Sequence, residues 1–240
     1  MPRAVFVHGF LGSPEDWSDV RAQLNPAIHC ECVSLRDLGC ASIAAAADAL
    51  AMELQKNRCD VLVGYSMGGR IALELTCTHP ELTHRLVLLS TSLGLHDEQE
   101  RRARAAKDDA RAEQLRTQGM AAFTRDWYAL PMFAPFRAHD SFARACERRV
   151  AGNPEFWAAC ITNCSPGRSA YRARDVGSLT ARVVLAVGDL DEYYVDLALR
   201  ATQLCPTLQV ERIAGSGHAL PLEVPLACAG IIERALKIDS

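Results

Sequence analysis

One serine of this chain lies in a setting typical of a catalytic nucleophile or base. Gly64, Ser66 and Gly68 match the pattern G-x-S-x-G, which places a serine on a sharp turn between a strand and a helix. Residues 60–63 before the motif form an apolar run, and residues 71–76 after it have a helical pattern. Glycine is needed on both sides of such a serine, because a Cβ atom there would collide with the adjacent strand and helix. The motif therefore predicts that Ser66 is exposed at the end of a strand.

A serine hydroxyl is a weak nucleophile and a weak base at neutral pH, so Ser66 needs a histidine to accept its proton and a carboxylate to fix that histidine's tautomer. His218 is the only histidine after position 139, and it lies in a glycine-containing loop after a predicted strand. Asp189 and Asp191 both follow another predicted strand. We favour Asp191, because the later residue reaches further over the sheet edge, and we expect Asp189 to form the turn. The three side chains would make a catalytic triad.

Two backbone N–H groups would be needed to stabilise negative charge on a substrate oxygen. One should belong to Met67, which directly follows the serine, and the other should come from the loop after the first strand. That loop contains His8, Gly9 and Phe10, and we expect the Phe10 N–H group to contribute. Phe10 and Met67 are therefore the predicted oxyanion hole.

Short apolar runs alternate with helical patterns along the chain, which indicates a parallel sheet with right-handed crossovers and flanking helices. The carboxyl edge of such a sheet is where α/β folds bind ligands. The serine motif and the histidine loop both follow strands, so they should meet at this edge. The predicted strands are residues 4–7, 28–33, 60–63, 85–89, 182–187 and 208–213.

The interval between the fourth and the fifth predicted strands is too long for one crossover. Residues 95–118 are charged, alanine-rich and free of glycine and proline, and residues 120–136 carry five aromatic side chains. We expect helices that form a lid over the carboxyl edge of the sheet. A chain of 240 residues can form one large core, so we expect one folding unit. The predicted organisation is a core of residues 1–93 and 176–240 with an inserted lid of residues 94–175.

The charges are unevenly distributed. The formal net charge of −3 indicates neither nucleic-acid binding nor general attraction to an anionic membrane. The predicted lid, however, holds 13 of the 23 arginines and one lysine against 11 acidic residues, which gives it a charge of +3. Arginine presents a planar fork of donors that suits carboxylates and phosphates. We therefore expect a small anionic substrate.

The ten cysteines are scattered through predicted strands and helices of a full-sized domain. A disulfide framework is typical of short secreted chains, so we expect free thiols that act as small buried hydrophobic side chains in a reducing cytosol. The close pairs Cys30/Cys32 and Cys160/Cys164 lack a second half with zinc-finger spacing, so no metal site is predicted. The chain has neither a leader-like segment nor an 18-residue apolar window, which favours a cytoplasmic protein without stable membrane insertion.

Together, residues 8–12, 64–70, 188–191 and 217–218 resemble the α/β-hydrolase superfamily, and the resemblance extends over essentially the whole chain. It implies a mostly parallel, twisted sheet flanked by helices, with a helical lid insertion. A narrower similarity is carried by Arg70 after the double glycine, the arginine-rich segment 98–104, residues 126–128 followed by 131–133, and Arg149 five residues before Pro154. In these details the sequence resembles the MenH family, the 2-succinyl-6-hydroxy-2,4-cyclohexadiene-1-carboxylate synthases of menaquinone biosynthesis.

The resemblance implies roles for particular residues. Ser66, Asp191 and His218 would be the triad, with Asp191 at the last position of the family's Gly-x-x-Asp. The other lid arginines, Arg101, Arg102 and Arg111, are expected on a solvated helix face. Residues 189–190 and 165–168 depart from the family's usual pattern. The residues implied to line the substrate site are Tyr65, Arg70, Arg104, Trp127, Tyr128 and Arg149, with Arg148 as the alternative to Arg149.

The reaction implied by the resemblance is an elimination that needs no cofactor. His218 would activate Ser66 as a base, and pyruvate would leave 2-succinyl-5-enolpyruvyl-6-hydroxy-3-cyclohexene-1-carboxylate, whose carboxylates suit arginine. A first alternative is a carboxylesterase, such as one similar to the pimeloyl-carrier-protein methyl ester esterase, for which a carrier protein would be a partner. A second alternative is a binding protein that has this fold without catalysis.

Overall fold

The computed structural model describes residues 1–206 and 208–237, which fold around one six-stranded sheet. The strand order is β2-β1-β3-β4-β5-β6, and all five neighbouring pairs are parallel. This arrangement confirms the predicted α/β fold. Each predicted strand lies within two residues of an observed one: β1 (Arg3–Val7), β2 (His29–Val33), β3 (Val61–Tyr65), β4 (Arg85–Leu89), β5 (Arg182–Gly188) and β6 (Gln209–Ile213).

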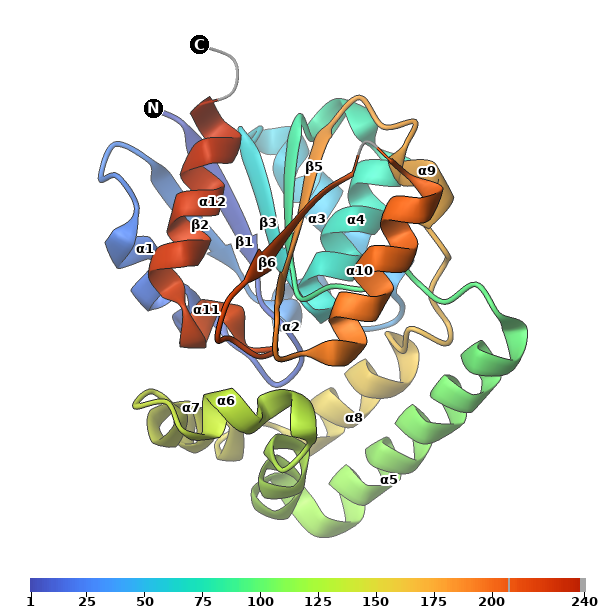
Figure 1. The fold of residues 1–240 in the computed structure, drawn as a ribbon. Coiled ribbons are helices and arrows are strands. Elements are labelled where there is room, and N and C mark those ends of the chain that lie inside the picture. The colour runs from blue at the N-terminus through green and yellow to red at the C-terminus, as the bar shows by residue number, and fades with distance from the viewer. Residues whose placement is uncertain (207, 238–240) are drawn as a thin grey trace.

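Helices cover both faces of the sheet (Figure 1). Successive side chains of a strand point to opposite faces, so Phe6 packs in a cluster with Trp17 while Val5 and Val7 join the cluster on the other side. Because both faces are covered, the strands read as continuous apolar runs. The flanking helices are α1 (Ser18–Gln23) and α12 (Pro225–Lys237) on one face, and α3 (Ile43–Lys56), α4 (Met67–Thr78) and α10 (Glu192–Leu204) on the other.

Short helices connect these elements. The N-terminus of α3 is capped by Ser42, whose hydroxyl accepts a hydrogen bond from the N–H group of Ala45 at 3.0 Å. The alanines that follow favour the helix, and their small side chains make up part of its buried face. The connecting helices are η1 (Pro14–Trp17), α2 (Leu35–Leu38), η2 (Pro80–Leu82) and α11 (Leu220–Glu223).

A helical insertion separates β4 from β5 and lies beyond the carboxyl ends of the strands, below the sheet in Figure 1. Its first helix, α5, is interrupted at Gly119, which has a φ of +76° that a residue with a side chain rarely adopts. The assignment of residues 94–175 as a separate lid stays a prediction. The insertion contains α5 (Glu98–Tyr128), η3 (Pro131–Phe133), α6 (Ala134–Arg137), α7 (Phe142–Val150), α8 (Pro154–Asn163) and α9 (Ala173–Val176).

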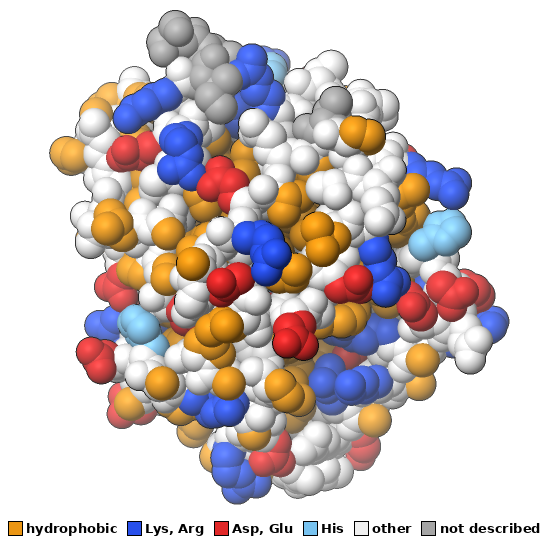
Figure 2. Space-filling model, in the orientation of Figure 1, with side chains coloured by type: hydrophobic (Ala, Val, Ile, Leu, Met, Phe, Trp, Pro, Cys, Tyr) orange, Lys and Arg blue, Asp and Glu red, His pale blue; other side chains and the backbone are white. Residues whose placement is uncertain are grey.

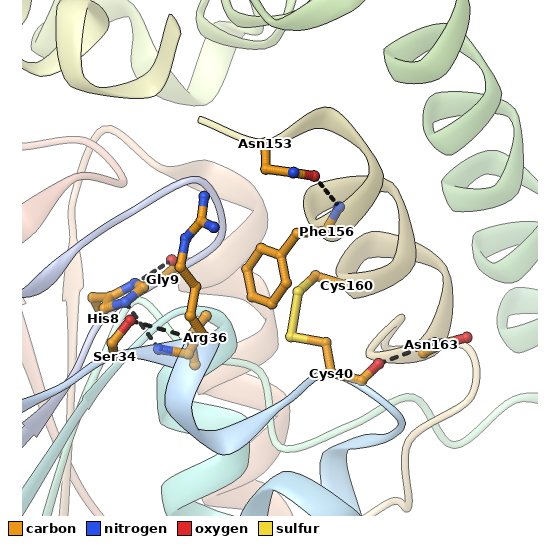
Figure 3. Close-up of a disulfide and its surroundings, with 10 residues drawn as sticks. His8, Gly9, Ser34, Arg36, Cys40, Asn153, Phe156, Cys160 and Asn163 are labelled. Atoms are coloured by element: carbon orange, nitrogen blue, oxygen red, sulfur yellow. Dashed lines mark hydrogen bonds between the residues drawn. A yellow bond between two sulfur atoms is a disulfide. The ribbon is translucent and has the colours of Figure 1, made fainter. Parts of the chain in front are cut away.

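A disulfide bond joins Cys40 to Cys160 (Figure 3), so the prediction that every cysteine is a free thiol was wrong for this pair. Cys40 lies between α2 and α3 in the core, whereas Cys160 lies on α8 of the insertion. The two residues are 120 positions apart in sequence, and only the fold brings their Cα atoms to 4.9 Å, a separation that suits a disulfide. The other eight cysteines are not part of a disulfide bond.

Further contacts surround the disulfide. The side-chain amide of Asn163 donates to the carbonyl of Cys40 at 2.9 Å, and the guanidinium of Arg36 lies 4.9 Å from the centre of the Phe156 ring (Figure 3). Both contacts run between the segment after β2 and α8. This part of the insertion is therefore attached to the core by covalent, polar and aromatic contacts together.

The surface is mixed in charge. On the face shown in Figure 2, side chains of lysine and arginine alternate with those of aspartate and glutamate, and apolar side chains lie between them. Among the helices of residues 1–206 and 208–237, none is long and apolar enough to cross a bilayer.

Candidate active site

Ser66 lies on the turn between β3 and α4 with φ +52° and ψ −112°, a conformation that non-glycine residues rarely adopt. A Cβ atom on Gly64 would lie 2.5 Å from the Cα of Gly69, and one on Gly68 would lie 2.3 Å from the carbonyl oxygen of Val7. Only glycine fits at either position, so the packing of α4 against β1 and β3 enforces the turn. The Ser66 N–H group donates to the carbonyl of Leu89 on β4 at 2.9 Å, which holds the turn at the sheet edge.

The structure brings Ser66, His218 and Asp191 into one chain of contacts. The distance from His218 Nε2 to Ser66 Oγ is 3.1 Å, and the distance from His218 Nδ1 to Asp191 Oδ2 is 2.7 Å. Asp191 and His218 are both buried. An ionised carboxylate can only accept hydrogen bonds, so Nδ1 must carry a proton and Nε2 is free to accept the proton of Ser66. The geometry suits proton removal from Ser66, whereas the catalytic roles stay a prediction.

The two acids after β5 occupy different places. The carboxylate of Asp189 accepts the N–H group of Gly215 at 2.8 Å and thus joins two loops. Asp191 comes directly before α10 and points to His218. The structure therefore places Asp191, and not Asp189, beside the histidine.

The loop that carries His218 is held from two sides. Glu223 on α11 accepts the N–H groups of Gly217 and Ala219 at 2.6 and 2.8 Å. The N–H group of His218 donates to the carbonyl of Met132 in the insertion at 3.1 Å. Burial raises the pKa of Glu223, although the two amide hydrogen bonds act in the opposite direction. Glu223 was not predicted from the sequence, because an acid five residues after a histidine is no recognised signal.

The loop after β1 is fixed by its histidine. The N–H group of Leu35 donates to His8 Nε2 at 3.1 Å, so Nδ1 carries the proton that it shares with the carbonyl of Gly9 at 2.9 Å. Burial lowers the pKa of His8, which keeps this ring neutral. Among the described residues, neither Phe10 nor Met67 has a recorded acceptor for its N–H group. Both groups are thus available as donors, and the oxyanion hole stays a prediction.

Ser66 and His218 open into a cavity of about 390 Å³ between the sheet edge and the insertion. Five charged residues line it, and four of them are cationic. In the part of the chain that the structure describes, no three His, Cys, Asp or Glu side chains are grouped to hold a metal ion. The sequence did not single out Lys107, Tyr193 or Tyr194 for this cavity. The charged and aromatic lining residues are Arg70, Arg104, Lys107, Asp108, Arg111, Phe10, Trp127, Tyr193 and Tyr194.

Arg70 lies at the wall of this cavity, one helical turn after Ser66, and is buried. Its guanidinium donates to the carbonyl of Cys164 and to the hydroxyl of Ser169, at 3.2 Å for the latter. Within residues 1–206 and 208–237, no carboxylate lies within ion-pair distance of it. Burial lowers the pKa of Arg70 to about 10, so it stays charged at neutral pH. A buried cation without a counter-ion is costly, and an anionic ligand would offset that cost.

Arg104 and Arg111 share one buried carboxylate, that of Asp108 on the same face of α5. The prediction of a solvated face was therefore wrong for Arg111, which lines the cavity and lies 5.0 Å from the centre of the Trp127 ring. It was also wrong for Arg101, which is half-buried and donates to the carbonyl of Gly167, while Arg102 is exposed as predicted. Residues three and four apart in a helix share a face, so Asp108 was a signal in the sequence for Arg111.

All three guanidinium nitrogens of Arg149 contact protein groups. Its guanidinium makes two hydrogen bonds with the carboxylate of Asp16, at 2.8 and 2.6 Å, and a third with the hydroxyl of Tyr128 at 2.9 Å. Arg148 also contacts Asp16, at 2.9 Å, but its side chain is partly exposed. Arg149, and not Arg148, borders a cavity of about 20 Å³ beside Ser66.

The predicted substrate-site residues thus fall into two groups. Arg70 and Arg104 line the large cavity, and Tyr65, Tyr128 and Arg149 line the small one, whereas Trp127 borders both. The small cavity is closed by rings, since the Tyr65 ring centre lies 5.6 Å from that of His218. Of these two cavities beside Ser66, the one of about 390 Å³ has room for a substrate and the one of about 20 Å³ does not.

Comparisons with known proteins agree with this geometry. A sequence model described as the alpha/beta hydrolase family matches residues 4–231. The chain is 31% identical over 250 residues to the 2-succinyl-6-hydroxy-2,4-cyclohexadiene-1-carboxylate synthase of Enterobacter sp. (strain 638), a match that covers 99% of this chain and 92% of that protein. It is 26% identical over 249 residues to protein PHYLLO, chloroplastic, of Arabidopsis thaliana, which covers 93% of this chain but spans only 14% of the plant protein.

Solved structures have the same fold. MenH from S. aureus has a TM-score of 0.89 at 24% identity and covers 98% of this chain and 93% of its own. A thermophilic esterase from Thermogutta terrifontis has a TM-score of 0.82 at 20% identity, with coverages of 99% and 90%. At these identities the structures establish the fold alone, whereas the family model and the Enterobacter relative establish the family. The protein is therefore an enzyme of the α/β-hydrolase family, and within it the chain belongs to the 2-succinyl-6-hydroxy-2,4-cyclohexadiene-1-carboxylate synthase (MenH) family.

Proposed function

We propose that the protein eliminates pyruvate from 2-succinyl-5-enolpyruvyl-6-hydroxy-3-cyclohexene-1-carboxylate and releases 2-succinyl-6-hydroxy-2,4-cyclohexadiene-1-carboxylate, as a cytoplasmic step of menaquinone biosynthesis. The name of the Enterobacter relative supports this product. The observation that carries the proposal is Arg70, a buried cation without a carboxylate partner among the described residues, in the cavity beside Ser66 and His218. The succinyl, enolpyruvyl and ring carboxylates of the substrate would supply the missing negative charge.

In this proposal Ser66 acts as a base. His218 Nε2 accepts the proton of Ser66 Oγ, and the serine oxygen removes a proton from a ring carbon of the substrate. The electron pair of that C–H bond forms a new double bond in the ring, the existing double bond shifts, and the C–O bond to the enolpyruvyl group breaks. The proton held by His218 passes to the leaving enolate, which becomes pyruvate, while the serine hydroxyl is restored by the ring proton. Asp191 stabilises the positively charged His218, and the amides of Phe10 and Met67 hold the negative oxygen that develops on the substrate. No acyl-enzyme forms and no cofactor takes part.

A carboxylesterase is the second candidate, because the same serine, histidine and pair of amides would also serve acyl transfer. The likeness in fold to the Thermogutta esterase is compatible with both chemistries. The cationic cavity favours the elimination, since a neutral ester would leave the buried charge of Arg70 without an anionic partner. Under the esterase alternative, a carrier protein could present the acyl group.

The decisive experiment measures pyruvate. Purified protein is mixed with the enolpyruvyl substrate, and pyruvate is followed through its reduction by lactate dehydrogenase. We expect rapid release from the wild type and none above background from Ser66→Ala. No release, together with fast hydrolysis of short acyl esters, would support the esterase instead. If a fluorophosphonate probe also fails to label Ser66, the protein is a non-catalytic binding protein.

A single substitution separates the two chemistries within one protein. Arg70→Ala removes the cation but leaves the triad in place, so we expect turnover of the polyanionic substrate to fall by about 100-fold or more. Hydrolysis of a neutral ester, if the wild type has any, should be retained. An equal loss of both activities would argue against a carboxylate-binding role for Arg70.

A further inference from the structure

Asp108 on α5 holds two arginines at the wall of the large cavity. This carboxylate is completely buried, and both of its oxygens are used. Oδ2 accepts from Arg104 Nε at 2.8 Å and from the hydroxyl of Ser165 at 2.8 Å, and Oδ1 accepts from Arg111 Nη1 at 3.2 Å. Asp108 is thus a shared anchor for the two arginines.

The two arginines keep unused donors. Each guanidinium has five N–H groups, and the contact with Asp108 uses one nitrogen of each. Across the described residues, no other acceptor is recorded for Arg104 or Arg111, and both side chains line the cavity. Two cations share one anion here, and Lys107 adds a third positive charge at the same wall. This end of the cavity is therefore cationic in its resting state.

Arg111 is oriented by stacking. Its guanidinium carbon lies 5.0 Å from the centre of the Trp127 ring, a cation–π contact that limits the guanidinium to one side of the indole. Trp127 in turn packs against Phe10, with ring centres 5.1 Å apart. Phe10 belongs to the loop that carries a predicted oxyanion-hole amide. The chain of rings thus fixes the position of Arg111 relative to Ser66.

We propose that Arg111 is a further substrate-binding residue, and that Asp108 presents Arg111 and Arg104 as a pair that binds one carboxylate of the substrate away from the reacting bond. Two guanidiniums on one anchor can each donate to a carboxylate oxygen. The proposal rests on the proposed function only in taking the substrate to be a polycarboxylate. Arg111 contributes to binding and not to the chemical step.

Binding of an unreactive tricarboxylate tests the proposal without turnover. Tricarballylate is titrated into the wild type and into Arg111→Gln by isothermal titration calorimetry, with Arg102→Gln as the matched control. Arg102 is an exposed arginine on the same helix, so its loss changes the net charge equally. We expect Arg111→Gln to weaken binding about tenfold or more, and Arg102→Gln to weaken it less than twofold. Arg111→Lys should fall between them, because it keeps the charge but loses the planar fork.

Two results would overturn the proposal. The first is a wild type that does not bind tricarballylate at millimolar concentration. The second is an Arg111→Gln variant that binds it as tightly as Arg102→Gln, with circular dichroism showing that both variants are folded.

Turnover gives an independent measurement. With the enolpyruvyl substrate, Arg111→Gln should raise KM about tenfold while kcat changes less than about twofold, because a binding contact shared by ground state and transition state affects KM alone. A fall in kcat with unchanged KM would contradict the assigned role. If no pyruvate is released but tricarballylate binding still depends on Arg111, the proposed reaction fails and this inference stands.

Discussion

Ser66 holds a backbone conformation that costs free energy and that the surrounding packing enforces. A non-glycine residue at such a φ is strained by roughly 1–3 kcal/mol, whereas glycine adopts it freely at the expense of about 0.5–1 kcal/mol of extra chain entropy. We therefore expect the free energy of unfolding of Ser66→Gly to be about 1 kcal/mol higher than that of Ser66→Ala. Urea denaturation of the two inactive variants measures the difference, and coincident midpoints would contradict it.

The carboxyl group of Asp16 should make the free energy of unfolding depend on pH in the acidic range. Burial raises the pKa of its carboxyl, but the charge and hydrogen bonds of Arg149 and the hydrogen bond of Arg148 lower it more, so the pKa in the folded protein lies below 3.8. A carboxyl whose folded pKa is lowered contributes stability above its unfolded pKa, and that stability is lost as the pH falls through the folded pKa. We expect the free energy of unfolding to decline below about pH 4, by up to about 1.4 kcal/mol per pH unit for this group.

The variant Asp16→Asn isolates this contribution. It removes the titrating group, so the decline in acid should be shallower than in the wild type. At pH 7 it should also lower the free energy of unfolding by about 3–5 kcal/mol, because it leaves the guanidinium of Arg149 buried without its counter-ion. Chemical denaturation between pH 3 and pH 7 measures both effects, and parallel curves for the two proteins would refute the assignment.

The positions of some site residues could be predicted from the sequence, whereas the partners of others could not. Ser66 and His218 were assigned from local signals, a glycine motif and a loop after a strand, because those signals encode the local backbone. The partner of Arg149, in contrast, depends on which distant elements meet in space. Asp16 lies 133 positions before Arg149, and no local pattern connects them. The sequence therefore predicted how many charged residues the insertion has, but not which distant residues form ion pairs.

At the scale of elements, the strands were predictable because each is buried on both faces and so appears as an apolar run. Helix α5 was predictable in composition but not in shape, since Gly119 interrupts it without ending the insertion. The attachment of α8 to the core was not foreseen. Cysteine composition alone carries no information on which two thiols the fold brings together, so the Cys40–Cys160 bond required the structure.

This disulfide should stabilise the attachment of α8. Closing a loop of 120 residues is worth about 4–5 kcal/mol in the chain-entropy model, which for a protein of this size corresponds to a melting temperature higher by about 10 °C or more. We expect dithiothreitol to lower the melting temperature of the wild type. The double variant Cys40→Ser, Cys160→Ser should melt at the lower temperature with or without the reductant.

A count of thiols checks the same bond directly. Ellman titration of the denatured protein should give eight thiols before reduction and ten afterwards, since eight of the ten cysteines lie outside the disulfide bond. Ten thiols in protein purified without reductant would show that the bond does not form.

At the scale of the whole molecule, positive charge is concentrated in the cavity where the substrate would bind. The chain carries a formal charge of −3, yet the large cavity is lined by Arg70, Arg104, Lys107 and Arg111 against Asp108. A negative exterior with a positive cavity directs a polyanion to one place. The sequence predicted this contrast, because the arginine-rich segment between the fourth and fifth strands could be counted before its shape was known.

Added salt should therefore lower kcat/KM for the polyanionic substrate. Dissolved ions screen partly exposed charges over about 8 Å at physiological ionic strength and over shorter distances at higher salt. We expect kcat/KM for the polyanionic substrate to fall several-fold between about 0.05 and 0.5 M sodium chloride. The rate with a neutral ester serves as the control and should stay level. A rate with the polyanion that is independent of salt would indicate that the cavity cations do not attract the substrate.

The bond between Cys40 and Cys160 also divides the molecule topologically. It closes a covalent ring that contains Ser66 and the cavity arginines, whereas Asp191 and His218 lie on the tail that leaves the ring. A protease that cuts the chain in the exposed residues 116–118, directly before the interruption of α5, would open the ring without releasing a fragment. The nicked protein should migrate as one species on a non-reducing gel and as two after reduction, and its serine and histidine should stay on one covalent unit until the disulfide is broken.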